Sequence, residues 1–464
     1  MRSSWHRRLA VAGLAAIGVV LLAAPPAAAH GAGTLSGLPL PRWQFAWGIA
    51  AVVIIAFFAV GSTWRRPRLD AAADGRPFPG WARPVTTVLG VVLRVVGVVV
   101  YVVVVTAGLF GSEFPAANIA PIGVFITFWV GIQFVSMFLG DVWRVLSPFE
   151  TLALVGAWAR ALVRREPLAP VEPDEGASHW PAVAAVAGFV WLELAYHAPT
   201  TPKVLGSVAL AYGVVELAAA ARWGRGWLRT GEGFAALFSL FAAMAPLARD
   251  GRGGLKVRWP LSGLSRLVVR PGTLPLLFVV LGAAIFDGVN RTTFWFDLTV
   301  ERLGWGYTAV NTLGLAWTIG IVALVYLSVL RVVARVVDED PDETAVRYAP
   351  ILVPMSAAYT VAHYFSVLVL EGQGFWFLIS NPYGNGWDLF GTDDNTVDFN
   401  LVSTATITWV QAAAIGVGMV GAVIVAHDRA IRDHPPRQAL TAQYVLLALF
   451  VGAAVTAVAL FLGN

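Results

Sequence analysis

Histidines and carboxylates are the side chains in this sequence whose types and spacing could do chemistry. The chain contains no cysteine, which excludes disulfides, iron–sulfur clusters and cysteine nucleophiles. Any metal site must therefore use histidine, carboxylate or backbone ligands. The sequence also has no phosphate-binding loop ending in Lys-Ser/Thr, no His-Glu-x-x-His motif and no Gly-x-Ser-x-Gly motif. Nothing in it therefore supports an ATPase, a zincin or a serine hydrolase.

His30 is the first candidate metal ligand. Cleavage of a leader after Ala29 would make it the mature N-terminus, so that one residue offers both an α-amino group and an imidazole nitrogen. Copper, or another divalent metal ion, suits such a nitrogen-rich site. Glu193 and His197 stand four residues apart, on one face of a predicted helix, and complete the predicted site. The alternative is that His30 merely follows a cleavage site and that His197 faces water before Pro199.

His363 and Glu371 form the second candidate pair and are the predicted catalytic residues. Both belong to a predicted membrane span over 350–371, and at 1.5 Å per residue they lie roughly 12 Å apart along the helix axis. They therefore cannot touch. Ionisable side chains within spans usually face a bundle interior or a water-filled cavity, which makes His363 a candidate general base or proton relay. The alternative is a structural histidine, hydrogen-bonded beside Tyr364 and Ser366.

Two other groups of charged residues favour structural roles. Asp287 and Arg291 are four residues apart near the end of the sixth predicted span, where a local ion pair is expected. Three aspartates of a long loop lack the regular ligand spacing of a calcium-binding loop, and we interpret them as a solvated acidic surface: Asp393, Asp394 and Asp398.

The elements that must position these residues are membrane spans. Hydrophobic residues make up 58% of the chain and charged residues only 13%, too little polar surface for a water-soluble globule of this size. The basic start, the apolar run over 9–24 and the small residues over 25–29 predict a secretory signal peptide over 1–29. An uncleaved first helix is the alternative. Without Arg2, Arg7 and Arg8 of this leader the chain has 29 basic and 28 acidic side chains, so nucleic acid is not an expected partner.

Residues 30–464 are predicted to form a single all-α domain, a polytopic transmembrane helix bundle of about ten spans in the lipid bilayer. Two further apolar pieces, 145–163 and 232–248, are predicted to be interfacial or re-entrant helices. The ten predicted spans cover 45–63, 86–108, 118–139, 181–198, 203–221, 273–290, 306–330, 350–371, 401–426 and 440–462.

Charge asymmetry predicts the orientation of this bundle in the cell membrane. With ten spans, 24 of the 32 Lys and Arg residues fall in segments on one side, and four fall on the other. Basic residues favour the cytoplasm. We therefore expect segments 222–272 and 331–349 to be cytoplasmic. The long loop over 372–400 and both mature termini are expected to be external.

Three strings in the C-terminal third occur together: AHYFS at 362–366, GWDLFGT at 386–392 and AHDRA at 426–430. With GDVWR at 140–144, they make the chain resemble, over nearly its whole length, the bacterial integral membrane proteins labelled fenitrothion hydrolase. Glu371 departs from this pattern, because an uncharged residue is expected before Gly-Gln. The resemblance implies hydrolysis of an organophosphate triester and supplies no catalytic residues.

Two function classes follow from the sequence. The first is a membrane enzyme that hydrolyses a small organophosphate triester at the outer face, with a metal ion as its cofactor. The second is a non-enzymatic channel, transporter or copper-handling membrane protein. A chromogenic phosphotriester assay with and without added metal separates the two classes.

Overall fold

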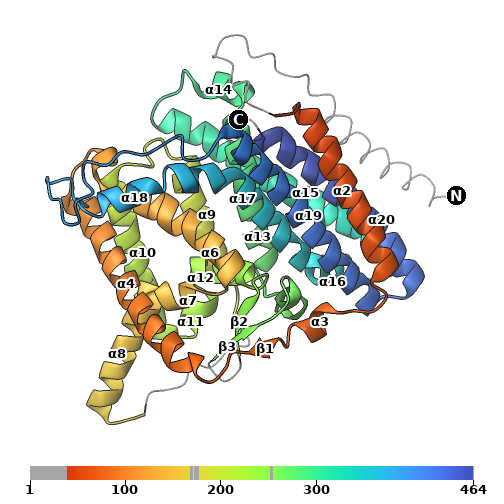
Figure 1. Cartoon of the computed structure of the whole chain (residues 1–464), viewed down its shortest axis with the longest axis horizontal. Helices are drawn as coiled ribbons and strands as arrows, with labels where there is room; N and C mark the ends of the chain where they lie inside the picture. The colour runs from red at the N-terminus through yellow and green to blue at the C-terminus, as the bar shows by residue number, and fades with distance from the viewer. Residues whose placement is uncertain (1–38, 168–170, 172–176, 251–253, 463–464) are drawn as a thin grey trace.

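The computed structural model describes residues 39–167, 171, 177–250 and 254–462 (Figure 1). The predicted signal peptide and His30 lie outside these residues. Within them the chain is a bundle of long helices, and nine of these are long and apolar enough to cross a membrane. The prediction of an all-α, multi-pass membrane protein is therefore confirmed.

Seven of the nine spans are single helices, and two are composite. The third span runs over Ile119–Leu139 and consists of α5 (Ile119–Pro121), a π-helix η2 (Ile122–Gly131) and α6 (Ile132–Leu139). Another span runs over Pro341–Leu370 and consists of α16 (Pro341–Tyr348), η4 (Ala349–Ile351) and α17 (Leu352–Leu370). The single-helix spans are α2 (Arg42–Thr63), α4 (Ala82–Phe110), α10 (Pro202–Trp223), α13 (Thr273–Asn290), α15 (Trp305–Val337), α19 (Thr404–Asp433) and α20 (Pro436–Phe461).

The span predicted over 181–198 is shorter than expected. It forms α9 (Trp180–Leu194), whose 15 residues extend about 22 Å, less than the ~30 Å of a hydrocarbon core. The helix ends because the chain turns toward α15, where the backbone N–H of His197 donates to the Thr308 hydroxyl at 3.1 Å. Pro199 then follows, and proline cannot donate to a continuing helix. The number of long spans in the described residues is thus nine, against about ten predicted.

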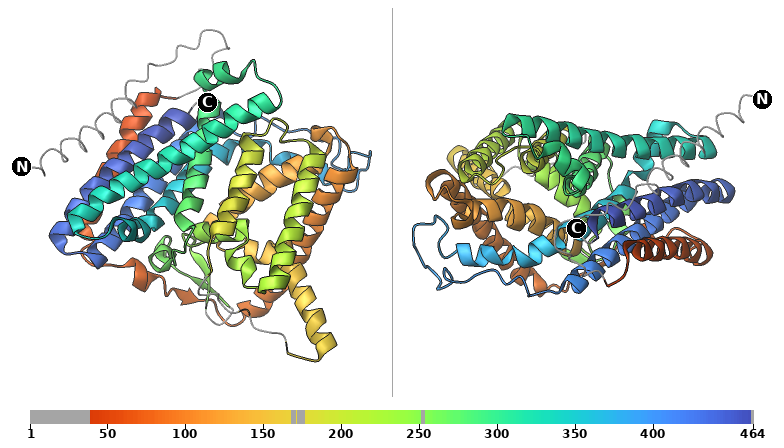
Figure 2. Two further views of the ribbon diagram at one scale, coloured as in Figure 1. Left: turned by 180° about the vertical axis from the view of Figure 1, so that it is seen from behind. Right: turned by 90° about the horizontal axis from the view of Figure 1, so that it is seen from above.

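The two segments predicted to be interfacial or re-entrant do form short helices. The first, α8 (Pro148–Arg164), projects from the bundle beside the lower ends of α4 and α10 (Figures 1 and 2). The second, α12 (Gly233–Ala242), is buried almost completely and packs against α6 and α9. Ten residues extend only about 15 Å, so α12 enters the bundle without crossing it.

Local sequence signals explain where several of these helices begin. The Ser147 side chain accepts a hydrogen bond from the Glu150 N–H at 3.3 Å at the start of α8, and Ser403 accepts one from the Thr406 N–H at 3.1 Å at the start of α19. Asp340 accepts from two N–H groups at the start of α16. Such caps satisfy N–H groups that have no partner within the helix.

Connecting segments collect at the two ends of the bundle. One end, which we call the inner end, carries α3 (Leu69–Ala72), α7 (Trp143–Leu146), α11 (Trp227–Thr230) and η3 (Ser262–Arg266), together with a small antiparallel sheet in the order β1-β3-β2. Its strands are β1 (Arg76–Pro77), β2 (Leu247–Arg249) and β3 (Leu255–Val257). The opposite, outer end carries η1 (Pro115–Ala117), α14 (Thr293–Thr299) and α18 (Gln373–Leu378) (Figure 1). The described residues of 222–272 and the segment 331–349 lie toward the inner end, and 372–400 lies at the outer end; which end faces the cytoplasm stays a prediction.

The AHDRA string joins neighbouring segments at the inner end by hydrogen bonds. One carboxylate oxygen of Asp428 accepts from the Trp64 indole N–H at 3.1 Å and from the backbone N–H groups of Arg68 and Leu69 at 2.6 and 3.2 Å. The neighbouring His427 ring lies between the Gln443 side chain and the Trp64 carbonyl, at 2.6 and 2.7 Å. This string therefore fastens α19 to the turn that follows α2 and to α20. Its role in the structure is architectural.

Candidate functional site

A histidine and an aspartate from two different spans meet in the interior of the bundle. His363 is on α17 and Asp287 is on α13, and Nε2 of the imidazole forms a short hydrogen bond with Oδ2 of the carboxylate. The two residues are only 6% and 8% exposed. The second carboxylate oxygen of Asp287 lies 3.6 Å from Nε of Arg291, one helical turn further along α13. The predicted ion pair of Asp287 and Arg291 is thus confirmed, and the structure adds His363 to it.

A third helix contributes a second carboxylate to this group. Glu193, on α9, accepts a hydrogen bond from the Tyr364 hydroxyl at 3.4 Å through Oε1, whereas its Oε2 is buried and has no hydrogen-bond partner. Glu193 also lies close enough to Asp287 and Arg291 to interact with both electrostatically. We call the five residues Glu193, Asp287, Arg291, His363 and Tyr364 the outer polar cluster, because Asp287 lies in the last turn of α13 and Arg291 caps that helix at the outer end.

The charge of the outer polar cluster depends on one proton. If both carboxylates and the guanidinium are ionised and the imidazole is neutral, two negative charges face one positive charge. One added proton, on His363 or on a carboxylate, makes the cluster neutral. Because an uncompensated charge in a membrane interior is costly, this arrangement favours taking up a proton. Arg291 is about half exposed and extends the cluster toward the outer surface.

A π-helix lies beside the outer polar cluster. The indole nitrogen of Trp129, near the end of η2, lies within electrostatic range of the Tyr364 hydroxyl but is buried without a hydrogen-bond partner. The wider π turn changes which backbone carbonyls find partners within the helix, and here the Gln133 side chain donates to the Trp129 carbonyl at 2.9 Å. Stretches of π-helix occur frequently at functional sites. No signal in the sequence distinguishes this segment from an ordinary span.

The two predicted catalytic residues lie apart. His363 is buried in the outer polar cluster, whereas Glu371 is exposed where α17 ends and no described contact joins its side chain to the cluster. Their separation along one helix is as expected. The carboxylate partner of His363 is instead Asp287, which is 76 positions away in the sequence.

The residues predicted to bind metal have different neighbours. His197 is exposed, and its Nδ1 lies 3.0 Å from the Thr308 hydroxyl while its ring packs against Trp305. Glu193 is directed toward Tyr364. Among the residues that the structure describes, no group of three or more histidines and carboxylates could hold a metal ion. His30 lies outside these residues, so the copper site stays a prediction.

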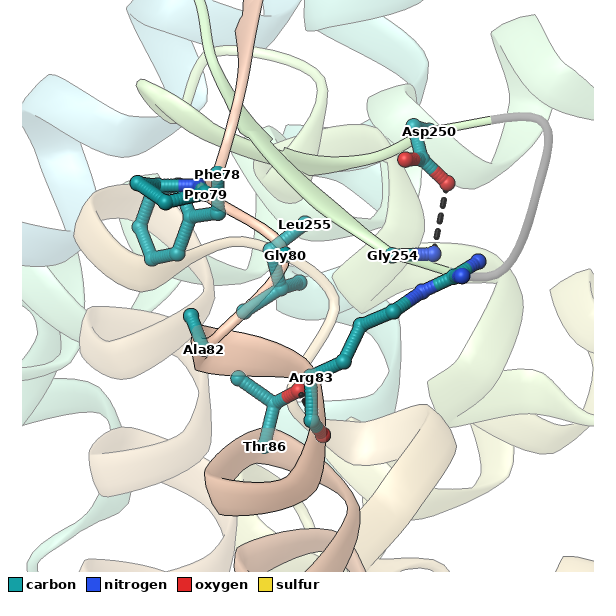
Figure 3. A pocket seen from close by; sticks show the side chains of 9 residues that line it. All are labelled: Phe78, Pro79, Gly80, Ala82, Arg83, Thr86, Asp250, Gly254 and Leu255. Carbon is teal, nitrogen blue, oxygen red and sulfur yellow. Dashed lines mark hydrogen bonds between the residues drawn. The ribbon is translucent and has the colours of Figure 1, made fainter.

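One pocket lies well away from the outer polar cluster, at the inner end (Figure 3). Its volume is about 190 Å³, and it lies between the segment after β1, the start of α4 and the adjoining ends of β2 and β3. Its lining residues are Phe78, Pro79, Gly80, Ala82, Arg83, Thr86, Asp250, Gly254 and Leu255. None of them belongs to the cluster, so this pocket contributes nothing to its chemistry.

The strings that carry the family resemblance have different roles in the structure. AHYFS supplies His363 and Tyr364 to the outer polar cluster. GWDLFGT folds the outer loop, where the Asp388 side chain accepts from the backbone N–H groups of Thr392 and Asp393 at 2.9 and 3.2 Å. The AHDRA string, by contrast, places its buried ionisable residues at the inner end of α19.

No protein-family model, curated protein or solved structure matches the chain. A function must therefore be proposed from the geometry described above.

Proposed function

We propose that this protein moves protons across the cell membrane, as a channel or a proton-coupled transporter, and that the outer polar cluster is its protonation site. The observation that carries this proposal is the buried His363–Asp287 pair beside a Glu193 oxygen without a partner. Ionisable residues inside spans are costly, and they usually mark ion pathways or proton relays. A histidine is the side chain whose ordinary pKa lies nearest to physiological pH.

The orientation belongs to the same proposal. The Lys and Arg asymmetry supports a cytoplasmic inner end, with the mature N-terminus, the C-terminus and the loop over 372–400 outside. In this orientation Arg291 faces the exterior.

The proposal is tested by proton flux into liposomes. Purified protein is reconstituted with an internal pH-sensitive dye, and a potassium gradient with valinomycin sets the voltage. We expect the wild type to acidify the lumen faster than protein-free liposomes, and we expect Asp287→Asn to abolish the difference. The matched control is Asp297→Asn, because Asp297 is exposed on α14 at the same end of the bundle. Wild-type flux equal to that of protein-free liposomes at both voltage polarities would refute the proposal.

A second candidate function is the hydrolase that the family resemblance implies. The hydrogen bond to Asp287 uses Nε2 of His363, so Nδ1 is the nitrogen that would accept a proton from an attacking water. A carboxylate that orients an imidazole is a common general-base arrangement. The test is release of nitrophenol from a nitrophenyl phosphotriester, with and without added divalent metal. His363→Gln should abolish the release, and release no faster than in protein-free liposomes would reject this candidate.

A further inference from the structure

A second pair of buried carboxylates lies toward the inner end. Glu216, on α10, and Glu232, immediately before α12, are 4% and 1% exposed. The Tyr212 hydroxyl donates a short hydrogen bond to Glu232 and also interacts with Glu216. Glu216 accepts from the Trp227 indole N–H at 2.8 Å, and Glu232 accepts from the Trp143 indole N–H at 3.0 Å. We call Glu216 and Glu232 the inner acid pair, and Tyr212 is the tyrosine that bridges them.

The inner acid pair has no basic side chain among its interaction partners in the described structure. Its partners are the side chains of Tyr212, Trp143 and Trp227 and two backbone N–H groups in the first turn of α12. These two N–H groups donate to Glu232 at 3.1 and 2.7 Å. These donors are neutral. Two buried carboxylates that repel each other and face only neutral donors favour sharing one proton.

Aromatic side chains connect the inner acid pair to the outer polar cluster. The Tyr212 ring lies 5.5 Å from the Phe234 ring, between centroids, and Phe234 lies 6.2 Å from Trp129. Trp129 lies within electrostatic range of the Tyr364 hydroxyl without a hydrogen bond to it, and this hydroxyl donates to Glu193. These side chains form a column of neighbours between the two groups of carboxylates. The middle of this column, Phe234 and Trp129, is buried and contains no carboxylate or imidazole.

An independent observation marks the outer end of this column. Oε2 of Glu193 is buried without a hydrogen-bond partner, and leaving such an atom unpaired costs about 1–3 kcal/mol. A proton on this oxygen, or a water beside it, would remove that cost. Glu193 is therefore suited to receive a proton that arrives along the column.

We propose that the inner acid pair is a second proton-binding site, and that Phe234 and Trp129 form an apolar gate between it and Glu193. The inference rests on the proposed function. When water enters the gate, an O–H bond of the hydrated proton breaks and an O–H bond forms on Glu193, so the step transfers a proton and changes nothing else. When the gate is dry, the two sites exchange no protons. Glu232 caps the start of the re-entrant helix α12, and Phe234 lies in its first turn, so one short segment holds half of the inner acid pair and half of the gate.

The test compares variants in the same proteoliposome flux assay. Glu216→Gln keeps an acceptor for the Trp227 indole and removes the shared proton, and we expect its flux to fall to that of protein-free liposomes. Glu343→Gln is the matched control, because Glu343 is exposed on α16 at the inner end, and its flux should equal that of the wild type. Trp129→Ala should raise the flux, because it opens the gate to water.

A second measurement does not depend on flux. Infrared spectra of the wild type in detergent at neutral pH should contain absorption from protonated carboxyl groups, and the wild-type minus Glu216→Gln difference spectrum should show that part of this absorption is lost. Absence of wild-type flux would refute the proposed function and this inference with it. Wild-type flux that Glu216→Gln leaves unchanged would refute this inference alone, as would carboxyl absorption equal in the wild type and Glu216→Gln.

Discussion

Asp428 offers the most quantitative test of how the bundle is held together. Its single carboxylate oxygen accepts three hydrogen bonds, from the Trp64 indole and from the backbone N–H groups of Arg68 and Leu69. The residue is 2% exposed. In an Asp428→Ala variant all three donors lose their acceptor at once.

The expected loss of unfolding free energy depends on how deeply each of the three hydrogen bonds is buried. The hydrogen bond to Leu69 is buried, so its N–H would be left without a partner at about 1–3 kcal/mol. A hydrogen bond to a charged acceptor contributes roughly 1.5–3 kcal/mol. The other two hydrogen bonds are only partly buried, so water can bond to their donors in the variant and recover part of this free energy. We therefore expect Asp428→Ala to lower the free energy of unfolding by about 3–5 kcal/mol. Asp428→Asn keeps one acceptor oxygen in place and should cost about 1 kcal/mol.

Thermal unfolding in detergent, followed by size-exclusion chromatography after heating, gives these differences. Asp394→Ala is the matched control, because Asp394 is exposed in the outer loop, and surface substitutions usually change stability by less than about 0.5 kcal/mol. The order of stability should be wild type, Asp428→Asn and then Asp428→Ala. Equal stability of the wild type and Asp428→Ala, or of the two Asp428 variants, would show that the three hydrogen bonds do not fasten the inner end.

Three further outcomes are expected. First, burial and nearby Arg270 lower the pKa of His179, at the start of α9, to about 4; because the unfolded histidine binds a proton near pH 6.5, the folded protein should lose up to about 3 kcal/mol of stability as the pH falls from 6.5 to 4. His179→Gln should remove that part of the pH dependence, and a wild-type unfolding profile that is flat over this interval would contradict the assignment. Second, if the leader is cleaved after residue 29, purified mature protein should bind about one copper ion and His30→Ala should bind none, as measured by metal analysis; copper content unchanged in His30→Ala, or a mature N-terminus at another residue, would reject the predicted site. Third, in this cysteine-free chain, an impermeant thiol reagent applied to intact cells should label Asp394→Cys and leave Glu343→Cys unlabelled, and the reverse pattern would invert the orientation.

The architecture could be predicted from the sequence because spans depend on local composition. A run of about 20 apolar residues is visible without a partner, and the two short helices α8 and α12 were predicted because charge counting rejected them as spans. The length of α9 could not be predicted. The chain leaves α9 where the backbone N–H of His197 donates to the hydroxyl of Thr308. Thr308 belongs to α15 and is more than a hundred positions away in the sequence.

The candidate site was predictable only where its contacts are local. The ion pair of Asp287 and Arg291 was expected because side chains four positions apart on a helix face each other. The partner of His363 was not, because one sequence does not show which helices of a bundle are neighbours. The second predicted catalytic residue, Glu371, is exposed, whereas Asp287 and Glu193 approach from α13 and α9.

The most direct test of the central claim compares two glutamates in one assay of voltage-driven proton flux. Oε2 of Glu193 is buried in the outer polar cluster, whereas Glu371 is exposed where α17 ends. Our account predicts that Glu193→Gln reduces the flux to that of protein-free liposomes, while Glu371→Gln transports protons as fast as the wild type. Full flux in Glu193→Gln, or loss of flux in Glu371→Gln alone, would contradict the claim that the outer polar cluster carries the proton.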